Sequence, residues 1–252
     1  MDKKMTVVIL AGGFGLRVRD YNARIPKALV PIGGMAIITH VMKIYSHYGH
    51  DRFIICAGYK SKQIKDYLEN RNRQNIKSKF DIKVVDTGMN TPTGGRIKVV
   101  EKYIDSEDFF VTYCDGVSDL DINKLYRFHK KMGKMITLTA VHPMSPFGIV
   151  EVKKGVVKSF KEKPMLPGLI NGGFFVFSKR IFKHLKRNSV LEEEVIKKLT
   201  EKEQLAAYIH YGFWSCMDTF KDVIRLNALW HGKYMPYSGV TLSKAPWKVW
   251  VD

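Results

Sequence analysis

The sequence predicts an α/β protein with a Rossmann-like, mostly parallel twisted sheet flanked by helices and a small antiparallel extension. Up to about residue 142, short apolar runs alternate with stretches of helical periodicity. This alternation is typical of parallel strands joined by crossover helices. After His142, three strand-sized runs follow one another closely, which is typical of antiparallel strands.

The parallel part of the sheet is expected from five apolar runs of strand length: Thr6–Ala11, Arg52–Ala57, Lys83–Asp86, Phe109–Cys114 and Ile136–Val141. Between them, helical patterns cover Ile37–Tyr48, Ser61–Asn70, Gly95–Ile104 and Ile122–Met132. Gly49 is expected to end the first of these helices and Ser61 to cap the second. Asp119 and Asp121 are candidate caps for the fourth.

The second part of the chain is expected to add antiparallel strands and further helices. Strands are predicted at Phe147–Val152, Val156–Glu162 and Asn171–Phe177, and helices at Arg180–Arg187, Leu191–Thr200 and Phe220–His231. The tail beyond Gly232 contains Pro236, Gly239 and Pro246 and is expected to be irregular. Because no linker or repeat interrupts the pattern, we predict a single domain over residues 1–252.

The bulk composition excludes several classes of protein. The chain has 252 residues and a net charge of +18, but its lysines are spread out and accompany no nucleic-acid-binding motif, so we expect no nucleic-acid partner. No apolar run approaches the roughly 20 residues that span a bilayer, and no secretory signal is apparent, so a cytoplasmic protein without a membrane partner is expected. Cys56, Cys114 and Cys216 lack metal-site spacing, and buried free thiols are expected for the first two.

Ligands of open parallel sheets bind at the carboxyl ends of the strands, and polar motifs do follow the predicted strands. The first strand leads into a glycine-rich loop that comprises Leu10, Ala11, Gly12, Gly13, Phe14, Gly15, Leu16 and Arg17. Glycines let backbone N–H groups approach a phosphate, and Arg17 adds a fixed positive charge. A tight turn is the alternative. The spacing matches neither the P-loop nor the dinucleotide-binding fingerprint.

Lysine and glycine residues in two further segments are candidate ligand contacts. Lys27 follows Pro26 in an irregular segment, where it is either a surface lysine or a cation that reaches back to the same phosphate. Thr93, Gly94 and Arg96 precede and open a helix, which makes them candidate anion or base contacts. Arg96 is expected to point either toward the ligand or into solvent.

Carboxylates after strands are candidate metal ligands. Asp115 follows a buried strand and suits Mg²⁺, although an Asp-Gly turn gives the same pattern. Asp218 is either a helix N-cap, which its local sequence favours, or a second metal ligand. Glu162 and Asn171 are suited to hydroxyl groups, and Lys163 to a phosphate.

In combination, these residues resemble the sugar-phosphate nucleotidylyltransferase family, most closely its glucose-1-phosphate cytidylyltransferase branch. The resemblance runs from Val8 to Trp250 and rests on motifs in the family's order: Leu10–Arg17, Pro26-Lys27, Ile32–Gly34, Val85–Gly88, Thr93–Arg96, Thr112–Val117, Glu162–Pro164, Ile170–Val176, Gly212–Trp214, Met217–Thr219 and Ala245–Lys248. The Trp214 and Trp247 segments are typical of the cytidylyltransferase branch.

The resemblance implies a Mg²⁺-dependent enzyme that joins CTP to a phosphorylated small molecule and releases pyrophosphate, for capsule or lipopolysaccharide synthesis. The default acceptor is a sugar 1-phosphate, glucose 1-phosphate in particular. Residues 1–142 would bind the nucleotide and residues 143–252 the acceptor, with the antiparallel extension over the acceptor site. Because members of this family often assemble into oligomers, the resemblance also implies a homo-oligomer.

The resemblance also assigns roles to single residues. Arg17 and Lys27 would be catalytic, and Asp115 with Asp218 would hold Mg²⁺. The nucleotide would be bound by Leu10, Ala11, Gly12, Gly13, Gly15, Thr93, Gly94, Arg96 and Asp115. The acceptor would be bound by Gly116, Glu162, Lys163, Asn171 and Gly172.

Four departures from the family's pattern leave the acceptor open, among them a shorter Asn70–Val85 segment and an extra Tyr234–Ser243 stretch. Leu16 stands where the family has threonine, and Ile25 stands where it has lysine. A non-sugar phosphate such as phosphoglutamine, used for capsule modification, is therefore an alternative acceptor. A catalytically silent nucleotide-binding relative is a more distant alternative, which the intact Lys27, Asp115 and Asp218 disfavour.

Overall fold

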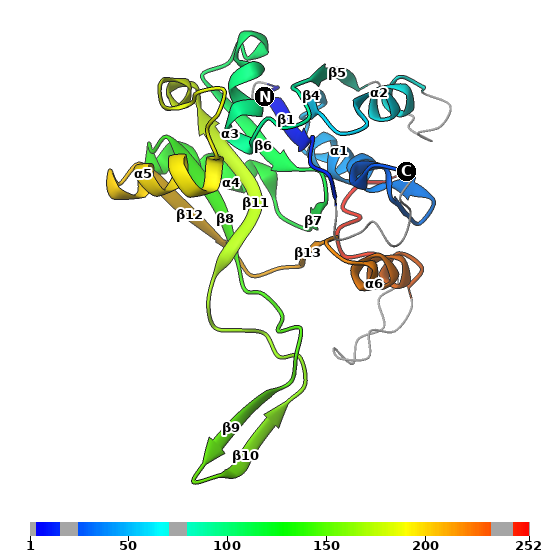
Figure 1. Cartoon of the computed structure of the whole chain (residues 1–252), viewed down its shortest axis with the longest axis vertical. Coiled ribbons are helices and arrows are strands. Elements are labelled where there is room, and N and C mark those ends of the chain that lie inside the picture. Colours follow the sequence, from blue (N-terminus) through cyan, green and yellow to red (C-terminus); the bar gives the residue numbers. More distant parts are fainter. Residues whose placement is uncertain (1–3, 16–24, 71–79, 233–243, 252) are drawn as a thin grey trace.

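A computed structural model describes residues 4–15, 25–70, 80–232 and 244–251 of the chain (Figure 1). Its centre is a seven-stranded sheet, whose strands in spatial order are β12 (Leu205–His210), β8 (Ile136–Val141), β11 (Ile170–Ser178), β6 (Asp108–Tyr113), β1 (Thr6–Ala11), β4 (Arg52–Ala57) and β5 (Asp81–Asp86). Strand β11 runs antiparallel to both of its neighbours, and the other paired strands are parallel. The predicted fold class is confirmed.

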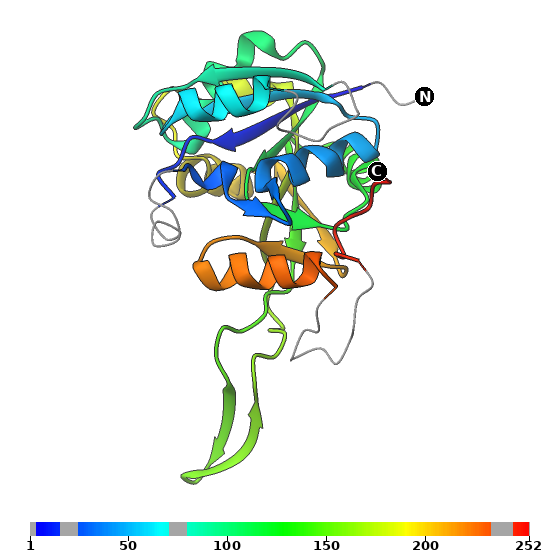
Figure 2. The ribbon, with the colours of Figure 1, turned by 90° about the vertical axis from the view of Figure 1, so that its right-hand side faces the viewer.

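Helices cover both faces of this sheet (Figures 1 and 2). They are α1 (Ile37–His47), α2 (Ser61–Glu69), α3 (Thr93–Val99), α4 (Ile122–Met132), α5 (Lys197–Glu201) and α6 (Phe220–Trp230). Alternate residues of β1 enter two separate apolar clusters: Val7 and Ile9 pack with α1, α2, α4 and α6, whereas Val8 and Leu10 pack with α3 and α5. The alternation along β1 thus buries both faces of the strand.

Several helix predictions need correction. The helix expected over Arg180–Arg187 is a 3-10 helix over Lys179–His184, because the buried Leu185 takes an extended backbone and ends it. The segment Leu191–Ile196 is a π-helix that continues into α5. The α-helix expected over Gly95–Ile104 covers Thr93–Val99, followed by a 3-10 turn.

The caps also differ in part from the predictions. Ser61 does not cap α2, because it is the first residue of the helix and its hydroxyl donates to Asp86. Asp121 caps α4 by accepting from the backbone N–H of Lys124. Asp119 instead forms a hydrogen bond of 2.8 Å with His210.

Three small antiparallel sheets complete the fold. They pair β2 (Pro31–Ile32) with β3 (Met35–Ala36), β7 (Gly116–Ser118) with β13 (Trp214–Cys216), and β9 (Ile149–Lys153) with β10 (Val156–Lys161). Five strands, β2, β3, β7, β12 and β13, were not predicted from the sequence. Cys56 and Cys114 are buried free thiols as expected, and Cys216 is also free.

The β9–β10 hairpin is the antiparallel extension, and it projects away from the body of the molecule rather than folding back over the sheet (Figures 1 and 2). One face of the hairpin is apolar, because Val150 pairs with Phe160 and Val152 pairs with Val157. These four side chains are between 51% and 64% exposed. Among the described residues, no helix is long and apolar enough to cross a bilayer.

Candidate active site

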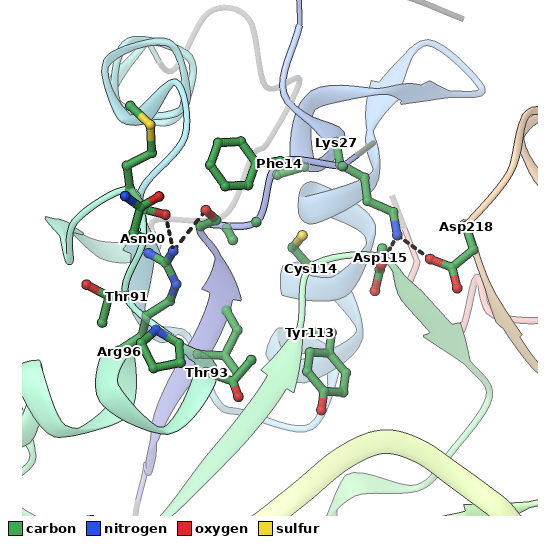
Figure 3. Close-up of a pocket in the computed structure, with 18 residues that line it drawn as sticks. Phe14, Lys27, Asn90, Thr91, Thr93, Arg96, Tyr113, Cys114, Asp115 and Asp218 are labelled. Carbon is green, nitrogen blue, oxygen red and sulfur yellow. Dashed lines mark hydrogen bonds and ion pairs between the residues drawn. The ribbon is translucent and has the colours of Figure 1, made fainter. Parts of the chain in front are cut away.

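A pocket of about 620 Å³ opens at the carboxyl ends of β1 and β6 (Figure 3). The sequence-predicted site residues that line it are Leu10, Ala11, Gly12, Gly13, Gly15, Lys27, Thr93, Arg96, Asp115 and Asp218. The rest of the lining consists of Phe14, Ala28, Met89, Asn90, Thr91, Pro92, Tyr113 and Cys114. Segments far apart in the sequence therefore meet where open parallel sheets bind their ligands.

Lys27 lies between two carboxylates on one side of the pocket (Figure 3). Its Nζ atom is 2.6 Å from Oδ1 of Asp218 and also forms an ion pair with Asp115. Burial by itself would lower the pKa of Lys27, but the adjacent carboxylates outweigh this effect and raise it above its ordinary value. The lysine therefore remains charged, and the three side chains form a preorganised cluster of fixed charges.

Local structure explains why these three residues meet. Lys27 begins a 3-10 helix directly after Pro26, and Asp115 follows the end of β6. The backbone N–H of Met217 donates to the carbonyl of Asp115 at 3.0 Å, which holds the Asp218 segment beside β6.

The N-cap alternative for Asp218 is wrong, because a different residue caps α6. Thr219 accepts from the backbone N–H of Asp222, whose side chain accepts in return from the backbone N–H of Thr219. This capping box leaves the Asp218 carboxylate in contact with Lys27.

Arg96 points neither into solvent nor toward an open part of the pocket. Its guanidinium donates to the carbonyls of Gly12, Ala57, Gly88 and Met89 and to the hydroxyl of Thr87, at 2.6 to 3.1 Å. The residue is 5% exposed, and burial lowers its pKa. Arg96 thus ties the end of β4 to the loops that follow β1 and β5. A direct contact of Arg96 with a nucleotide stays a prediction.

The buried guanidinium accounts for one glycine of the loop after β1. A Cβ atom at Gly12 would lie 2.0 Å from Nη1 of Arg96, so only glycine fits there. Gly13 has open space at the corresponding position. Gly15 has a φ of +62°, a left-handed conformation that favours glycine.

The remaining predicted residues lie outside this pocket. Gly94 is a buried residue of α3, at a position where a Cβ would lie 2.8 Å from the carbonyl oxygen of Ser189. The predicted acceptor residues are elsewhere in the fold: Gly116 in β7, Asn171 and Gly172 at the start of β11, and Glu162 and Lys163 after β10. Trp214 donates from its indole to the carbonyl of Gly172 at 2.7 Å, which ties β13 to β11. Arg17 and Leu16 lie outside the described residues.

Sequence reasoning missed Phe14, Asn90 and Tyr113 as pocket residues. Phe14 contacts the ring of Tyr59 at 5.4 Å between centroids and is 39% exposed. Asn90 follows the predicted strand that ends at Asp86, and Tyr113 is the last residue but one of the predicted strand Phe109–Cys114 and the last residue of β6. Their positions at or after the carboxyl ends of strands were a usable signal for the pocket.

The carboxylates of Asp115 and Asp218 fit a magnesium ion whose remaining ligands would be substrate phosphates and water. The carboxylates of Asp115 and Asp218 converge on one ammonium group, so their oxygens already face a common point. Mg²⁺ commonly binds through one or two carboxylates together with phosphate oxygens and water. The described part of the chain contains no group of three or more histidine, cysteine or acidic residues that could hold a metal by itself.

The chain matches a known family along most of its length. The family model described as "Nucleotidyl transferase" matches residues 6–233. The chain therefore belongs to the nucleotidyl transferase family, and it is an enzyme of that class. The family resemblance inferred from the motifs is confirmed.

Two individual relatives are similar to this chain over nearly its whole length. The chain is 41% identical to the glucose-1-phosphate cytidylyltransferase of Salmonella typhimurium over 266 aligned residues, which cover 98% of this chain and 100% of the relative. It is 36% identical to the Bacillus subtilis protein named "Probable glucose-1-phosphate cytidylyltransferase", with the same coverage of both chains.

Solved structures share the fold. HddC from Yersinia pseudotuberculosis superposes with a TM-score of 0.68 at 26% identity, over 88% of this chain and 98% of that one. The inositol-1-phosphate CTP transferase of T. maritima superposes with a TM-score of 0.66 at 17% identity, over 90% of this chain and 97% of that one. The second likeness concerns the fold alone.

Proposed function

We propose that this enzyme is a Mg²⁺-dependent cytidylyltransferase that joins CTP to a phosphorylated small molecule. The products are a CDP-activated compound and pyrophosphate. A sugar 1-phosphate, with glucose 1-phosphate as the default, is the proposed acceptor. The full-length similarity to glucose-1-phosphate cytidylyltransferases supports the choice of CTP and of this acceptor.

The observation that carries the proposal is the cluster of Lys27, Asp115 and Asp218 at the rim of a pocket large enough for a nucleotide. In the reaction, a phosphate oxygen of the acceptor attacks the α-phosphorus of CTP, and the bond to the leaving pyrophosphate breaks. The reaction needs no covalent enzyme intermediate. The protein contributes by positioning both phosphates and by neutralising the charge that grows on the leaving group.

Lys27 is suited to this task because it stays protonated and is held in place. When the nucleotide binds, its phosphates compete with Asp115 and Asp218 for the ammonium. The two carboxylates are then available to hold Mg²⁺, which would act as a Lewis acid on phosphate oxygens. Arg17 is proposed to add a second cation on the phosphates.

The acceptor side is the less constrained part of the proposal. Glu162, Lys163, Asn171 and Gly172 remain its proposed contacts, and a non-sugar phosphate such as phosphoglutamine is the alternative acceptor. A role in capsule or lipopolysaccharide synthesis and a cytoplasmic location are part of the same proposal.

Pyrophosphate release with Mg²⁺ tests the function. Four nucleoside triphosphates are crossed against glucose 1-phosphate, other sugar 1-phosphates and phosphoglutamine. Release that requires both CTP and glucose 1-phosphate supports the default reaction. Release with CTP and only a different acceptor retains cytidylyl transfer and replaces the acceptor, and no release with any pair contradicts the proposal.

A further inference from the structure

A carboxylate behind the pocket holds two of the residues that line it. Glu192 lies in the π-helix Leu191–Ile196, on the far side of Thr93 and Tyr113 from the cavity. Its Oε2 atom accepts from the hydroxyl of Thr93 at 2.7 Å, and its Oε1 atom accepts from the hydroxyl of Tyr113. Figure 3 shows both hydroxyls directed away from Lys27 and Arg96, out of the cavity.

The chemistry of the three groups fixes the direction of these bonds. An ionised carboxylate only accepts hydrogen bonds, so both hydroxyls must donate to Glu192. Thr93 also accepts from the backbone N–H of Leu191 at 3.0 Å, which orients its side chain from a second direction. Burial and the charge of Glu192 raise the pKa of Tyr113 above its ordinary value, so the phenol keeps the proton that it donates.

The surroundings hold Glu192 itself in place. The backbone N–H of Gly95 donates to the carbonyl of Ser189 at 3.0 Å. A Cβ at Gly95 would lie 2.0 Å from the carbonyl oxygen of Arg187, so this glycine permits the close approach of the segment before the π-helix. The helix that carries Glu192 is therefore fixed against α3, the helix that begins at Thr93.

Glu192 lies apart from the charged cluster of the site. No hydrogen bond or ion pair links it to Lys27 or Asp218, and its partners among the described residues are two uncharged hydroxyl groups. Its negative charge is unfavourable for a phosphate nearby, whereas the side chains that it holds suit the uncharged part of a nucleotide.

We propose that Glu192 is a positioning residue that fixes Thr93 and Tyr113 as the wall of the pocket against which the nucleoside part of the substrate binds. This inference rests on the proposed function and deepens it. It separates the pocket into a phosphate end at Lys27 and a nucleoside wall that Glu192 supports. Removing Glu192 should weaken nucleotide binding and leave the chemical step largely unchanged.

Steady-state kinetics of the full chain tests this division. In Glu192→Ala, KM for CTP should rise about 10- to 100-fold, because hydrogen bonds to a charged group are lost, while kcat stays within about threefold of wild type. The KM of Glu192→Gln for CTP should lie between those of wild type and Glu192→Ala, because an amide can still form hydrogen bonds with both hydroxyls. Glu193→Ala is the matched control, since Glu193 is an exposed residue of the same helix.

A double-mutant cycle separates positioning from general loss of structure. If Glu192 acts through Tyr113, the double variant should raise KM for CTP by less than the product of the increases in Glu192→Ala and Tyr113→Phe. An unchanged KM for CTP in Glu192→Ala, or a loss confined to kcat, would overturn the inference. Wild-type protein that fails to turn over CTP would instead refute the proposed function, so the two failures are distinguishable.

Discussion

Replacing Lys27 with methionine removes the ammonium between Asp115 and Asp218 and leaves a side chain of similar length. Breaking a buried ion pair costs about 3–5 kcal/mol. Here the side chains of Lys27, Asp115 and Asp218 are 15%, 18% and 39% exposed. Solvent screening should therefore reduce the loss of unfolding free energy to about 1–2 kcal/mol.

The effect on turnover should be much larger than the effect on stability. Removing one group that stabilises charge in a transition state typically lowers kcat by about 100- to 1,000-fold. We expect a loss of this size for Lys27→Met in pyrophosphate release, with a thermal midpoint only a few degrees lower. Lys62→Met is the matched control, because Lys62 is exposed on α2.

Metal binding by Lys27→Met provides a second test, in which the variant should bind more tightly than wild type although its turnover is lower. Without Lys27, the carboxylates of Asp115 and Asp218 lose their competing cation, so Mn²⁺ should bind the nucleotide-free variant on the order of tenfold more tightly. Calorimetric titration of wild type and variant measures this change. Turnover within threefold of wild type, or weaker Mn²⁺ binding, would refute the assigned roles.

Three further predictions concern a glycine of the pocket, a buried histidine and the β9–β10 hairpin. Gly12→Ala should force Arg96 out of place and lower the free energy of unfolding by about 1–3 kcal/mol. Gly13→Ala is the control, because a Cβ at Gly13 has open space and should leave that free energy unchanged. Chemical denaturation measures the free energy of unfolding of both variants. Burial lowers the pKa of His40 from 6.5 to about 4, so the folded state binds fewer protons than the unfolded state between these values. Stability should therefore fall by up to about 3 kcal/mol as pH drops through this window, and urea unfolding should show a flatter pH dependence for His40→Gln. If the chain forms the predicted homo-oligomer through the apolar face of the hairpin, replacing both Val152 and Val157 with lysine should lower the mass seen by light scattering. An unchanged mass for that double variant would exclude this face as the interface.

Local sequence was sufficient for the elements with strong apolar periodicity. The bounds of β1, β4, β8 and α4 agree with the predictions, because the three strands are almost continuously buried and the buried residues of α4 recur at helical spacing. Strand β12 was missed because it lies at an edge of the sheet, where only one of its six residues is fully buried.

The site depended on long-range contacts that no local pattern contains. Lys27 and Asp218 are 191 positions apart, and their separate surroundings favoured a surface lysine and a helix cap. From the sequence, only the order of the motifs along the chain indicated that these two residues belong to one site. The partners of Arg96 are mostly backbone carbonyls from separate segments. Because every residue has a carbonyl, residue types alone could not predict these hydrogen bonds.

The most direct test of the central claim is the fate of the phosphorus atoms of CTP. With [α-³²P]CTP, Mg²⁺ and the accepted phosphorylated substrate, the label should appear in a CDP-linked product, whereas label from [γ-³²P]CTP should appear in pyrophosphate. Transfer of the γ-label to the acceptor, or release of the α-label as CMP without a CDP-linked product, would contradict cytidylyl transfer.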